Sequence, residues 1–280
     1  MSFVLITGAS KGIGQACALR LAARGHVVFA GIRRPGDGAV LHDHCGSAIV
    51  PLILDVTNER QVEAAAAAIA ERVGPEGLAG LVNNAGIALA GPLEFLPISE
   101  LRRQFDVNVF GQIAVTQALL PLLRRARGRI VNIGSIAGRS SLPITGAYAA
   151  SKHALEALSD ALRVELMPWG IQVAIVEPGV IATPIWQTSI ETAEHTLSQL
   201  PPSAREYYGR VMDGLKRRAL GGALRGLPPE RVAAAVEHAL FARKPRTRYV
   251  VGRDARVRLL LQKLPDRWRD RLIARRLERL

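Results

Sequence analysis

Short runs of β-branched residues alternate with helical stretches along most of this chain, and this alternation constrains its fold more than any other feature. We expect strands at residues 4–7, 27–30, 49–54, 81–83, 129–133, 172–177 and 249–251. Helices are expected at residues 12–23, 59–71, 99–125 and 147–166. Strands that alternate with helices form crossover units, which place the strands in a parallel sheet covered on both faces. The sequence therefore predicts an α/β fold, with a doubly wound parallel sheet of about seven strands flanked by helices on both faces.

Residues 183–229 interrupt this alternation. The stretch is long, contains five prolines and has weak helical signals. Long irregular insertions within a compact domain are uncommon and often functional. We therefore expect a substrate lid at about residues 183–229, within a single catalytic domain of residues 1–252.

Positive charge is concentrated near the C-terminus. The formal net charge is +13, and residues 243–280 carry 14 Lys and Arg against 4 Asp and Glu. Residues 253–280 alternate Arg with apolar residues at near-helical spacing, which predicts a basic amphipathic extension. We expect it to pack on the body or on a neighbouring subunit, with peripheral contact to an anionic membrane as the alternative. Nucleic acid is not an expected partner, because the positive charge is confined to the tail and no known nucleic-acid-binding motif accompanies it.

The cysteine and histidine patterns predict no metal site. Cys17 and Cys45 have no CxxC spacing, which argues against a zinc site or a disulfide framework. His42 and His44 form an HxH pair in an expected surface loop without further ligands. The chain has no run of 18 uncharged apolar residues, and residues 1–7 do not have the pattern of a signal peptide. We therefore expect a cytoplasmic protein, associated with membranes at most peripherally.

A glycine-rich turn follows the first expected strand directly and reads Thr7-Gly8-Ala9-Ser10-Lys11-Gly12-Ile13-Gly14. Glycines let the backbone turn tightly and approach a pyrophosphate closely. The helix that follows offers free N–H groups and the positive end of its dipole to phosphates. Because the turn lies between a strand and a helix, it predicts a Rossmann-like, dinucleotide-binding domain.

The TGxxxGxG spacing of this turn resembles that of the short-chain dehydrogenase/reductase family, and four further motifs follow in the family's order. They are Asp55-Val56, Asn83-Asn84-Ala85-Gly86, the pair Tyr148 and Lys152 with Ser135 thirteen residues before the tyrosine, and Pro178-Gly179 followed by Thr183. The likeness covers roughly residues 3–252. It implies an oxidoreductase that moves a hydride between a nicotinamide and an alcohol or ketone, working as a homodimer or homotetramer built on the two long helices.

The resemblance also implies which residues hold the cofactor. The family's Asp at the third strand contacts adenine, NNAG lies along the cofactor, and the PG…T segment lies near the nicotinamide amide. Carried over to this sequence, the cofactor-binding residues are Gly8, Ser10, Lys11, Gly12, Ile13, Gly14, Arg33, Asp55, Val56, Asn84, Ala85, Gly86, Tyr148, Lys152, Pro178, Gly179 and Thr183.

The end of the second expected strand predicts which nicotinamide is preferred. NAD enzymes usually carry an acid there for the ribose 2′-hydroxyl. This chain has Arg33 and Arg34 instead, and Asp37 lies several residues beyond the strand. A 2′-phosphate requires positive charge, and arginine can bind it in a bidentate way. Arg33 and Lys11 occupy the positions of basic residues in NADP-preferring relatives, so NADP(H) is the expected cofactor and NAD(H) the alternative.

The expected catalytic set is Asn108, Ser135, Tyr148 and Lys152. Tyr148 and Lys152 are four residues apart on a predicted helix and share a face. A nearby cation lowers the pKa of a tyrosine from its free value of ~10 and makes it a better base. Ser135 is expected to hydrogen-bond the substrate oxygen. Asn108 lies between two valines on a buried helix and needs a polar partner; the resemblance implies that it holds a water in a relay reaching Lys152.

The substrate is expected to be hydrophobic. The segments flanking the nicotinamide site are mostly apolar or aromatic, which suits a bulky alcohol or ketone. The candidate pocket residues are Leu93, Phe95, residues 137–145, Ile185, Trp186, Ile190, Tyr207 and Tyr208. Within the family, the chain looks like the branch that handles steroids, retinoids and lipid-like alcohols.

Two other functions stay open at this point. One is a regulatory protein that kept the dinucleotide fold and lost turnover, since a fold alone does not imply activity. The other is a non-redox use of the same site, such as dehydration or epimerisation. The complete catalytic set argues against the first, because a protein without turnover would usually have lost one of the four residues.

Overall fold

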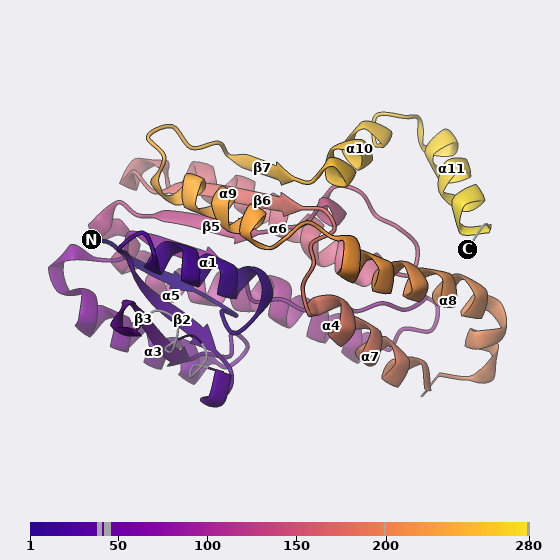
Figure 1. Ribbon diagram of the computed structural model, residues 1–280, viewed down its shortest axis with the longest axis horizontal. Coiled ribbons are helices and arrows are strands. Elements are labelled where there is room, and N and C mark those ends of the chain that lie inside the picture. The colour runs from indigo at the N-terminus through magenta and orange to yellow at the C-terminus, as the bar shows by residue number, and fades with distance from the viewer. Residues whose placement is uncertain (38–40, 42–45, 199, 279–280) are drawn as a thin grey trace.

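A seven-stranded parallel sheet forms the centre of the protein (Figure 1). The structure is a computed structural model that describes residues 1–37, 41, 46–198 and 200–278. Its strands are β1 (Phe3–Ile6), β2 (Val27–Ile32), β3 (Ile49–Ile53), β4 (Gly80–Asn83), β5 (Arg129–Ile133), β6 (Gln172–Pro178) and β7 (Arg248–Val251). They lie in the order β3-β2-β1-β4-β5-β6-β7, with every neighbouring pair parallel. The predicted fold class is confirmed.

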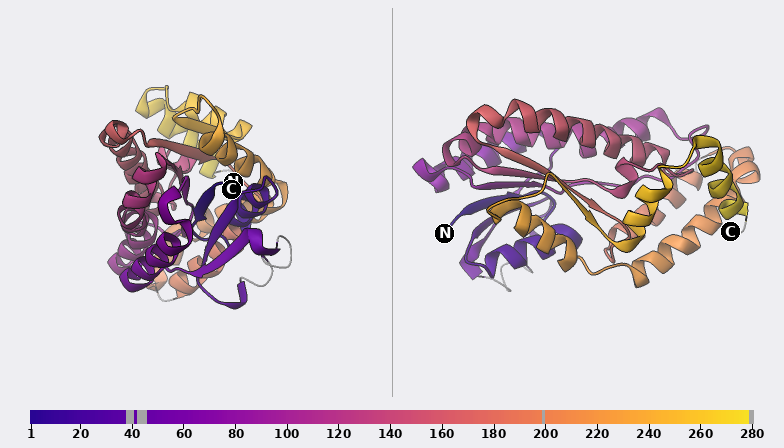
Figure 2. Two further views of the ribbon diagram at one scale, coloured as in Figure 1. Left: turned by 90° about the vertical axis from the view of Figure 1, so that its left-hand side faces the viewer. Right: turned by 90° about the horizontal axis from the view of Figure 1, so that it is seen from above.

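Two layers of helices cover the sheet (Figure 2). Helices α1 (Gly12–Ala22) and α9 (Glu230–Phe241) pack together on one face. Helices α3 (Glu59–Val73), α5 (Gly111–Ala126) and α6 (Gly146–Glu165) cover the other. Each layer closes a hydrophobic core against the sheet, and all four residues of β1 are buried between the two cores. This double burial explains why the strands are almost continuously apolar rather than alternating.

The order of the strands places the ligand site. Successive strands run outward from β1 in two directions, first to β2 and β3, and then from β4 to β7. In doubly wound sheets, ligands bind beyond the carboxyl ends of the strands at this reversal point. The turns after β1, β4, β5 and β6 should therefore meet there.

The long helix expected at residues 99–125 is not uniform. It consists of α4 (Ile98–Phe105), a π-helical turn η3 (Asp106–Phe110) and α5. Such π-turns occur frequently at functional sites. Here the turn contains Asn108, whose side chain is fully buried. Short 3₁₀ turns occur at η1 (Gly46–Ala48), η2 (Gly74–Glu76), η4 (Ile136–Gly138) and η5 (Met167–Trp169).

The prediction of irregular structure at residues 183–229 is wrong. This stretch forms two helices, α7 (Ile185–Ser198) and α8 (Pro202–Arg225), which pack on each other. The prolines misled the interpretation because they act here as helix starts. Pro202 is the first residue of α8, and Pro184 directly precedes α7. Proline is well tolerated at such positions because the first N–H groups of a helix have no acceptor within the helix, so none of its hydrogen bonds is lost.

The C-terminal tail is helical, as its spacing predicted. Strand β7 leads into α10 (Arg253–Leu261), and α11 (Asp266–Glu278) follows. Helix α10 contacts β7 and η4, while α11 contacts α8. Helices α7, α8, α10 and α11 thus gather at one end of the molecule, at the right of Figure 1.

One helical run is long and apolar enough to span a membrane by length and composition. It covers Ile98–Ala126, and half of its most apolar window is buried inside the fold. This run is α4, η3 and α5, which pack on the sheet and on α6. Core helices of folded domains meet the same criterion, so the run is weak evidence for a membrane span.

Candidate active site

The turn between β1 and α1 is shaped for a close approach to its backbone. Gly8 has a φ of +63°, and a Cβ atom placed there would lie 3.0 Å from the Cα of Ala85. A Cβ on Gly14 would lie 2.3 Å from the carbonyl oxygen of Gly8. The side-chain amide of Asn84 donates to the carbonyl oxygens of Thr7 and Gly8, at 2.9 and 3.0 Å. Asn84, which follows β4, thus fixes the turn by hydrogen bonds to its backbone. The close contacts at Gly8 and Gly14 mean that both positions require glycine.

The first turn of α1 is suited to an anion. It contains no acidic residue, and Lys11 makes no side-chain cap bond within the described chain. The first N–H groups of a helix have no partner inside the helix, and the helix dipole makes this end positive. A diphosphate placed against the glycine turn would accept hydrogen bonds from these N–H groups. The residues present therefore fit the phosphates of a dinucleotide.

A large cavity of about 1480 Å³ opens beside this turn, at the carboxyl ends of the strands. It brings together nearly all of the predicted site residues, namely Gly8, Ser10, Lys11, Gly12, Ile13, Arg33, Asp55, Val56, Asn84, Ala85, Gly86, Ser135, Tyr148, Lys152, Pro178, Gly179 and Thr183. Two predicted site residues, Gly14 and Asn108, do not line it. Gly14 lies in the packing between α1 and the turn, and Asn108 is buried behind the cavity wall.

Next to β2 and β3, the cavity is lined by a basic residue and not by Asp37, the acid that could have bound a ribose 2′-hydroxyl. Arg33 is exposed and lines the cavity, whereas Asp37 does not line it. Asp55 is held in place by Thr57, whose backbone N–H and hydroxyl donate to Asp55 Oδ1 at 3.0 and 2.7 Å. Lys11 lines the same cavity. This side therefore offers two cations, at the end where a ribose 2′-phosphate would lie.

Tyr148 and Ser135 meet at the inner end of the cavity. Tyr148 lies in the first turn of α6, and Ser135 follows β5 and begins the turn η4. Ser135 Oγ accepts a hydrogen bond from Ala137 N at 3.1 Å, which orients the hydroxyl. Burial raises the pKa of Tyr148, while a hydrogen bond from Ser135 and the charge of Arg258 partly oppose this rise. In this structure the phenol is therefore kept in its protonated form.

Lys152 lies one helical turn after Tyr148, and its ammonium is held by a backbone carbonyl. Its Nζ donates to the carbonyl oxygen of Ile133 at 2.8 Å and lies 5.9 Å from the centre of the Tyr148 ring. Burial lowers the pKa of Lys152 to about 8, against the opposing effect of the Glu156 charge. The charge of Arg258 lowers the pKa of Tyr148. That Lys152 also lowers this pKa stays a prediction.

Asn108 fixes the loop that follows β4. Its Oδ1 accepts from Ile87 N at 2.9 Å, and its Nδ2 donates to Ile87 O at 3.0 Å and to Ser151 Oγ at 3.1 Å. Ser151 in turn donates to the carbonyl oxygen of Tyr148 at 2.7 Å. The polar partner expected for Asn108 is therefore a backbone segment at the cavity wall and a serine of the catalytic helix. The π-turn η3 is what directs this side chain inward.

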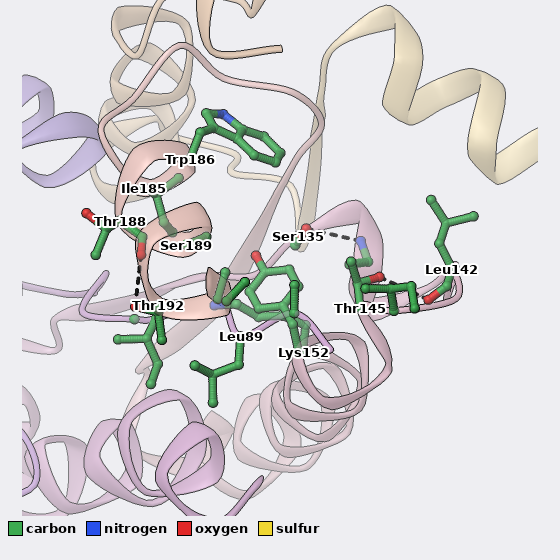
Figure 3. A pocket seen from close by; sticks show the side chains of 18 of the residues that line it. Leu89, Ser135, Leu142, Thr145, Lys152, Ile185, Trp186, Thr188, Ser189 and Thr192 are labelled. Carbon is green, nitrogen blue, oxygen red and sulfur yellow. Dashed lines mark hydrogen bonds between the residues drawn. The ribbon is translucent and has the colours of Figure 1, made fainter. Parts of the chain in front are cut away.

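The rest of the cavity is mostly apolar. Figure 3 shows Ser135 and Lys152 between Ile185 and Trp186 of α7 on one side and Leu142 and Thr145 on the other. The Trp186 indole N–H donates to the carbonyl oxygen of Ile181 at 2.7 Å, which fixes the ring. Ile190 also lines the cavity. These positions agree with the predicted substrate segments.

Four of the predicted substrate residues lie elsewhere. Phe95 packs against Tyr207 and Tyr208, and the Tyr208 hydroxyl donates to Glu94 at 2.8 Å. None of these side chains lines the large cavity, and Leu93 lies at a smaller neighbouring pocket. The aromatic residues attach α8 to the turn before α4, so they support the cavity wall without forming it.

Sequence reasoning missed the contribution of the tail to the cavity. Arg258, Leu261 and Gln262 come from α10 and its C-terminal end, and Leu272 and Ile273 come from α11; all five line the cavity. No local motif marks these positions, because they follow the shared motifs by many residues. The available signal was the amphipathic spacing of the tail, which predicted an apolar face without saying what that face would cover.

The described residues contain no group of three His, Cys, Asp or Glu side chains that could hold a metal ion. Cys17 is fully buried, and burial raises the pKa of its thiol to about 12, as expected for a packed thiol. His42, His44 and Cys45 lie outside the described residues.

Comparisons with known proteins find similarity along most of the chain. The family model for short chain dehydrogenases matches residues 2–194. The chain is 42% identical to retinol dehydrogenase 5 of Mus musculus over 264 residues, which cover 91% of this chain and 82% of that protein. It is 36% identical to the NADPH-dependent 3-dehydrocapnine reductase of Ornithobacterium rhinotracheale over 286 residues, covering 100% and 99%. A solved short-chain dehydrogenase/reductase from Burkholderia phymatum in complex with NAD has a TM-score of 0.80 and 26% identity, covering 93% and 92%.

Proposed function

Because this chain belongs to the short-chain dehydrogenase/reductase family, we propose that it transfers a hydride between NADP(H) and the hydroxyl or carbonyl group of a hydrophobic substrate. In this proposal Tyr148 is the general acid and base. The observation that carries it is the convergence of Tyr148, Ser135 and Lys152 at the inner end of a cavity that begins at the glycine turn.

The proton chemistry follows from the environment of Tyr148. When bound, the nicotinamide supplies or accepts the hydride. Reduction of a ketone leaves a negative charge on the substrate oxygen, and Tyr148 donates its phenol proton to that oxygen. The raised pKa of Tyr148 keeps the proton in place until it is needed. The Ser135 hydroxyl donates a hydrogen bond to the same oxygen and stabilises the developing charge.

The cofactor would extend along the carboxyl ends of β1 to β6. The N–H groups at the glycine turn would hold the diphosphate, Arg33 and Lys11 would hold the 2′-phosphate, and Asp55 would contact the adenine. Lys152 would hold the ribose hydroxyls. Pro178, Gly179 and Thr183 would contact the nicotinamide. All of these residues line the cavity.

NADP(H) is the preferred cofactor in this proposal, and NAD(H) is also accepted. Arg33 and Lys11 line the cavity and Asp37 does not, which supports NADP(H). The NADPH-dependent relative supports the same preference, and the NAD-bound neighbour supports the alternative. For Asn108 we propose a positioning role: it holds the loop at Ile87 and, through a water, takes part in a relay that reaches Lys152.

The domain boundaries form part of the proposal. Residues 1–252 form the catalytic domain, α7 and α8 act as the substrate lid within residues 183–229, and residues 253–280 are an extension that completes the substrate pocket. The residues beyond Tyr148 that line the cavity are largely apolar. They suit a bulky hydrophobic alcohol or ketone. One relative is a retinol dehydrogenase, which supports this substrate class.

The protein would work as a cytoplasmic homodimer or homotetramer built on the two long helices. Phe110 and Val164 are 62% and 61% exposed on the helical layer of α5 and α6, and an oligomer would bury them. Light scattering coupled to size exclusion should give a mass of two or four chains. A monomer at micromolar concentration would refute this assembly.

Peripheral contact with an anionic membrane is a second partner that the tail supports. Trp268 and Leu272, one helical turn apart on α11, are 66% and 48% exposed on a helix rich in arginine. A helix of this type can lie at a lipid surface. The wild-type protein should float with anionic liposomes, and a variant with Trp268→Ser and Leu272→Ser should not. Equal flotation of the two proteins would count against membrane contact.

An absorbance screen at the nicotinamide band tests the proposed function. It crosses NADPH and NADH with a panel of ketosteroids, aldehydes and small ketones. Carbonyl-dependent consumption of NADPH, strongest with hydrophobic carbonyls, is the expected result. Product formation without any change in the nicotinamide band would indicate a non-redox reaction, and NADPH binding without turnover across the panel would indicate a regulatory protein.

A further inference from the structure

Helix α10 brings an arginine into the wall of the cavity that the catalytic tyrosine also lines. Arg258 lines the cavity together with Val257 and Leu261 of the same helix. Its charge acts on the phenol of Tyr148, so the guanidinium lies within electrostatic reach of the reacting end of the cavity. The helix follows β7, which β4, β5 and β6 separate from β1 in the sheet. Arg258 therefore approaches from the side opposite the glycine turn, away from the phosphates of a dinucleotide.

Ser140 holds the guanidinium in a defined position. Arg258 Nη2 donates to the carbonyl oxygen of Ser140, and Arg258 Nε donates to its Oγ at 3.4 Å. Gln262 Nε2 donates to the same Oγ at 2.8 Å, and Arg269 of α11 donates to Gln262 Oε1 at 3.1 Å. Ser140 follows the catalytic Ser135 across the single turn η4. The arginine is therefore fixed relative to the catalytic loop.

The surrounding wall is mostly apolar, and it also carries cations and the acidic residue Asp254 of α10. Leu272, Ile273 and Leu277 of α11 continue the wall that α10 begins, and Arg269 and Arg276 border it. Across the cavity lie apolar side chains of α7, including Trp186 (Figure 3). A ligand in this half would contact hydrocarbon along most of its length and meet positive charge near Tyr148.

We propose that Arg258 binds an anionic group of the substrate. The preferred substrate would then be an amphiphilic ketone or alcohol, with an apolar chain and an anionic group such as a carboxylate within a few atoms of the reacting carbon. A guanidinium presents a planar fork of donors that matches a carboxylate, and such bonds strengthen in a site of low dielectric constant. This inference rests on the proposed function, because it names the substrate class of the same site.

A pair of substrates that differ only in charge tests the proposal. 3-Oxododecanoate and its methyl ester share the ketone and the chain, and NADPH oxidation reports the turnover of both. The wild-type protein should have a kcat/KM at least about tenfold higher for the acid, as a hydrogen bond to a charged group provides. Arg258→Gln should bring the ratio of acid to ester close to one, and Arg258→Lys should keep part of the preference. Arg256→Gln is the matched control, because Arg256 is exposed on the same helix and does not line the cavity.

A binding measurement separates this inference from the proposed function. Decanoate carries no ketone and cannot react, so calorimetric titration of the NADP⁺-saturated protein measures recognition of the anion alone. Decanoate should bind the wild-type protein and Arg256→Gln at least tenfold more tightly than Arg258→Gln. Turnover of the ester with no preference for the acid, or equal decanoate affinity in the three proteins, would overturn the inference and leave the proposed function intact. Tight decanoate binding without turnover of either ketone would instead count against the proposed function.

Discussion

At the scale of single residues, the structure separates motif positions into those that face the cavity and those that support it. Gly8 and Gly14 belong to one motif, yet only Gly8 lines the cavity, because Gly14 is required by the packing of α1 on the turn. Asn108 likewise acts on the backbone at Ile87 from behind the wall. Spacing along the chain predicts that such residues share a site, while the direction of each side chain depends on tertiary packing.

The arginines after β2 offer a test at this scale. Arg33 lines the cavity and its neighbour Arg34 does not. Arg33→Ser should lower kcat/KM for NADPH by about 10- to 100-fold, because a charged hydrogen bond to the 2′-phosphate is lost. The value for NADH should change by less than about threefold. Steady-state kinetics with both cofactors provide the measurement, and Arg34→Ser is the matched control. An equal loss with NADPH and NADH would contradict the assignment of Arg33 to the 2′-phosphate.

Arg258 illustrates the limit of prediction from local sequence. The site residues from Gly8 to Thr183 could be predicted because most follow the end of a strand in a short motif, while Tyr148 and Lys152 form a short motif on α6 and Asn108 lies in η3. Arg258 lies more than a hundred residues after Tyr148 and reaches it only because β7 adds to the sheet edge beside β6. Its place beside the phenol follows from this strand order, and no short spacing encodes it.

At the scale of elements, a cluster of buried charges joins β6, β7 and α6 behind the catalytic lysine. Arg248 of β7 pairs with Glu156 at 3.2 Å, Asp160 at 2.7 Å and Glu177 at 3.4 Å. Arg139 reaches Glu177 at 3.5 Å. Glu177 is fully buried and Glu156 nearly so. Arg248 therefore compensates three carboxylates, one of them shared with Arg139, and links the last strand to the catalytic helix.

Removal of this arginine should destabilise the fold strongly. Arg248→Ala leaves two buried carboxylates with little compensation, and the expected loss in free energy of unfolding is about 3 kcal/mol. Arg163→Ala is the matched control, because Arg163 of α6 pairs with the half-exposed Asp160 at 2.7 Å. Its loss should stay below about 1 kcal/mol. Urea unfolding followed by circular dichroism measures both, and similar losses in the two variants would contradict the role of Arg248.

The helices of the lid show why element prediction failed where it did. The strands and the helices beside them were predictable because buried faces impose strict apolar patterns. Helices α7 and α8 pack mainly on each other and contribute few buried residues, so their patterns are weak. The prolines at the starts of these two helices then look like helix-breaking residues in the sequence. The same sparse packing fits a segment that must open to admit a substrate.

At the scale of the whole molecule, the fold class could be predicted from the alternation of strands and helices along the chain. What this alternation could not give was the arrangement of the end that holds the substrate. Helices α7 and α8 come from one part of the chain and α10 and α11 from another, and all four contribute to the wall of one cavity (Figure 1). Their meeting depends on side-chain packing between elements far apart in sequence.

The stability of the whole molecule should depend on pH through Glu156. Burial, and next the charge of Glu177, raise the pKa of Glu156 from 4.5 to about 7. The folded state then keeps a proton that the unfolded state releases above pH 4.5. Because the unfolded state binds fewer protons in this range, the contribution of Glu156 to stability is full below pH 4.5 and is lost as the pH rises to 7.

Urea unfolding at pH 5 and at pH 7.5 measures this dependence. Glu156→Gln should remove much of the decrease in stability that the wild-type protein shows between the two values. Glu165→Gln, on the same helix at an exposed position, should leave the decrease unchanged. A wild-type decrease that persists fully in Glu156→Gln would show that other groups cause it.

The central claim is that Tyr148 transfers the proton while the cofactor exchanges the hydride. The most direct test compares Tyr148→Phe with the wild-type protein on the best carbonyl substrate from the screen, with NADPH binding followed by fluorescence. Tyr207→Phe is the matched control, because Tyr207 is exposed and lies outside the cavity. Loss of the phenol proton should lower kcat by about 10²- to 10⁴-fold and leave NADPH affinity unchanged. A Tyr148→Phe enzyme with a kcat within tenfold of the wild-type value would contradict the mechanism.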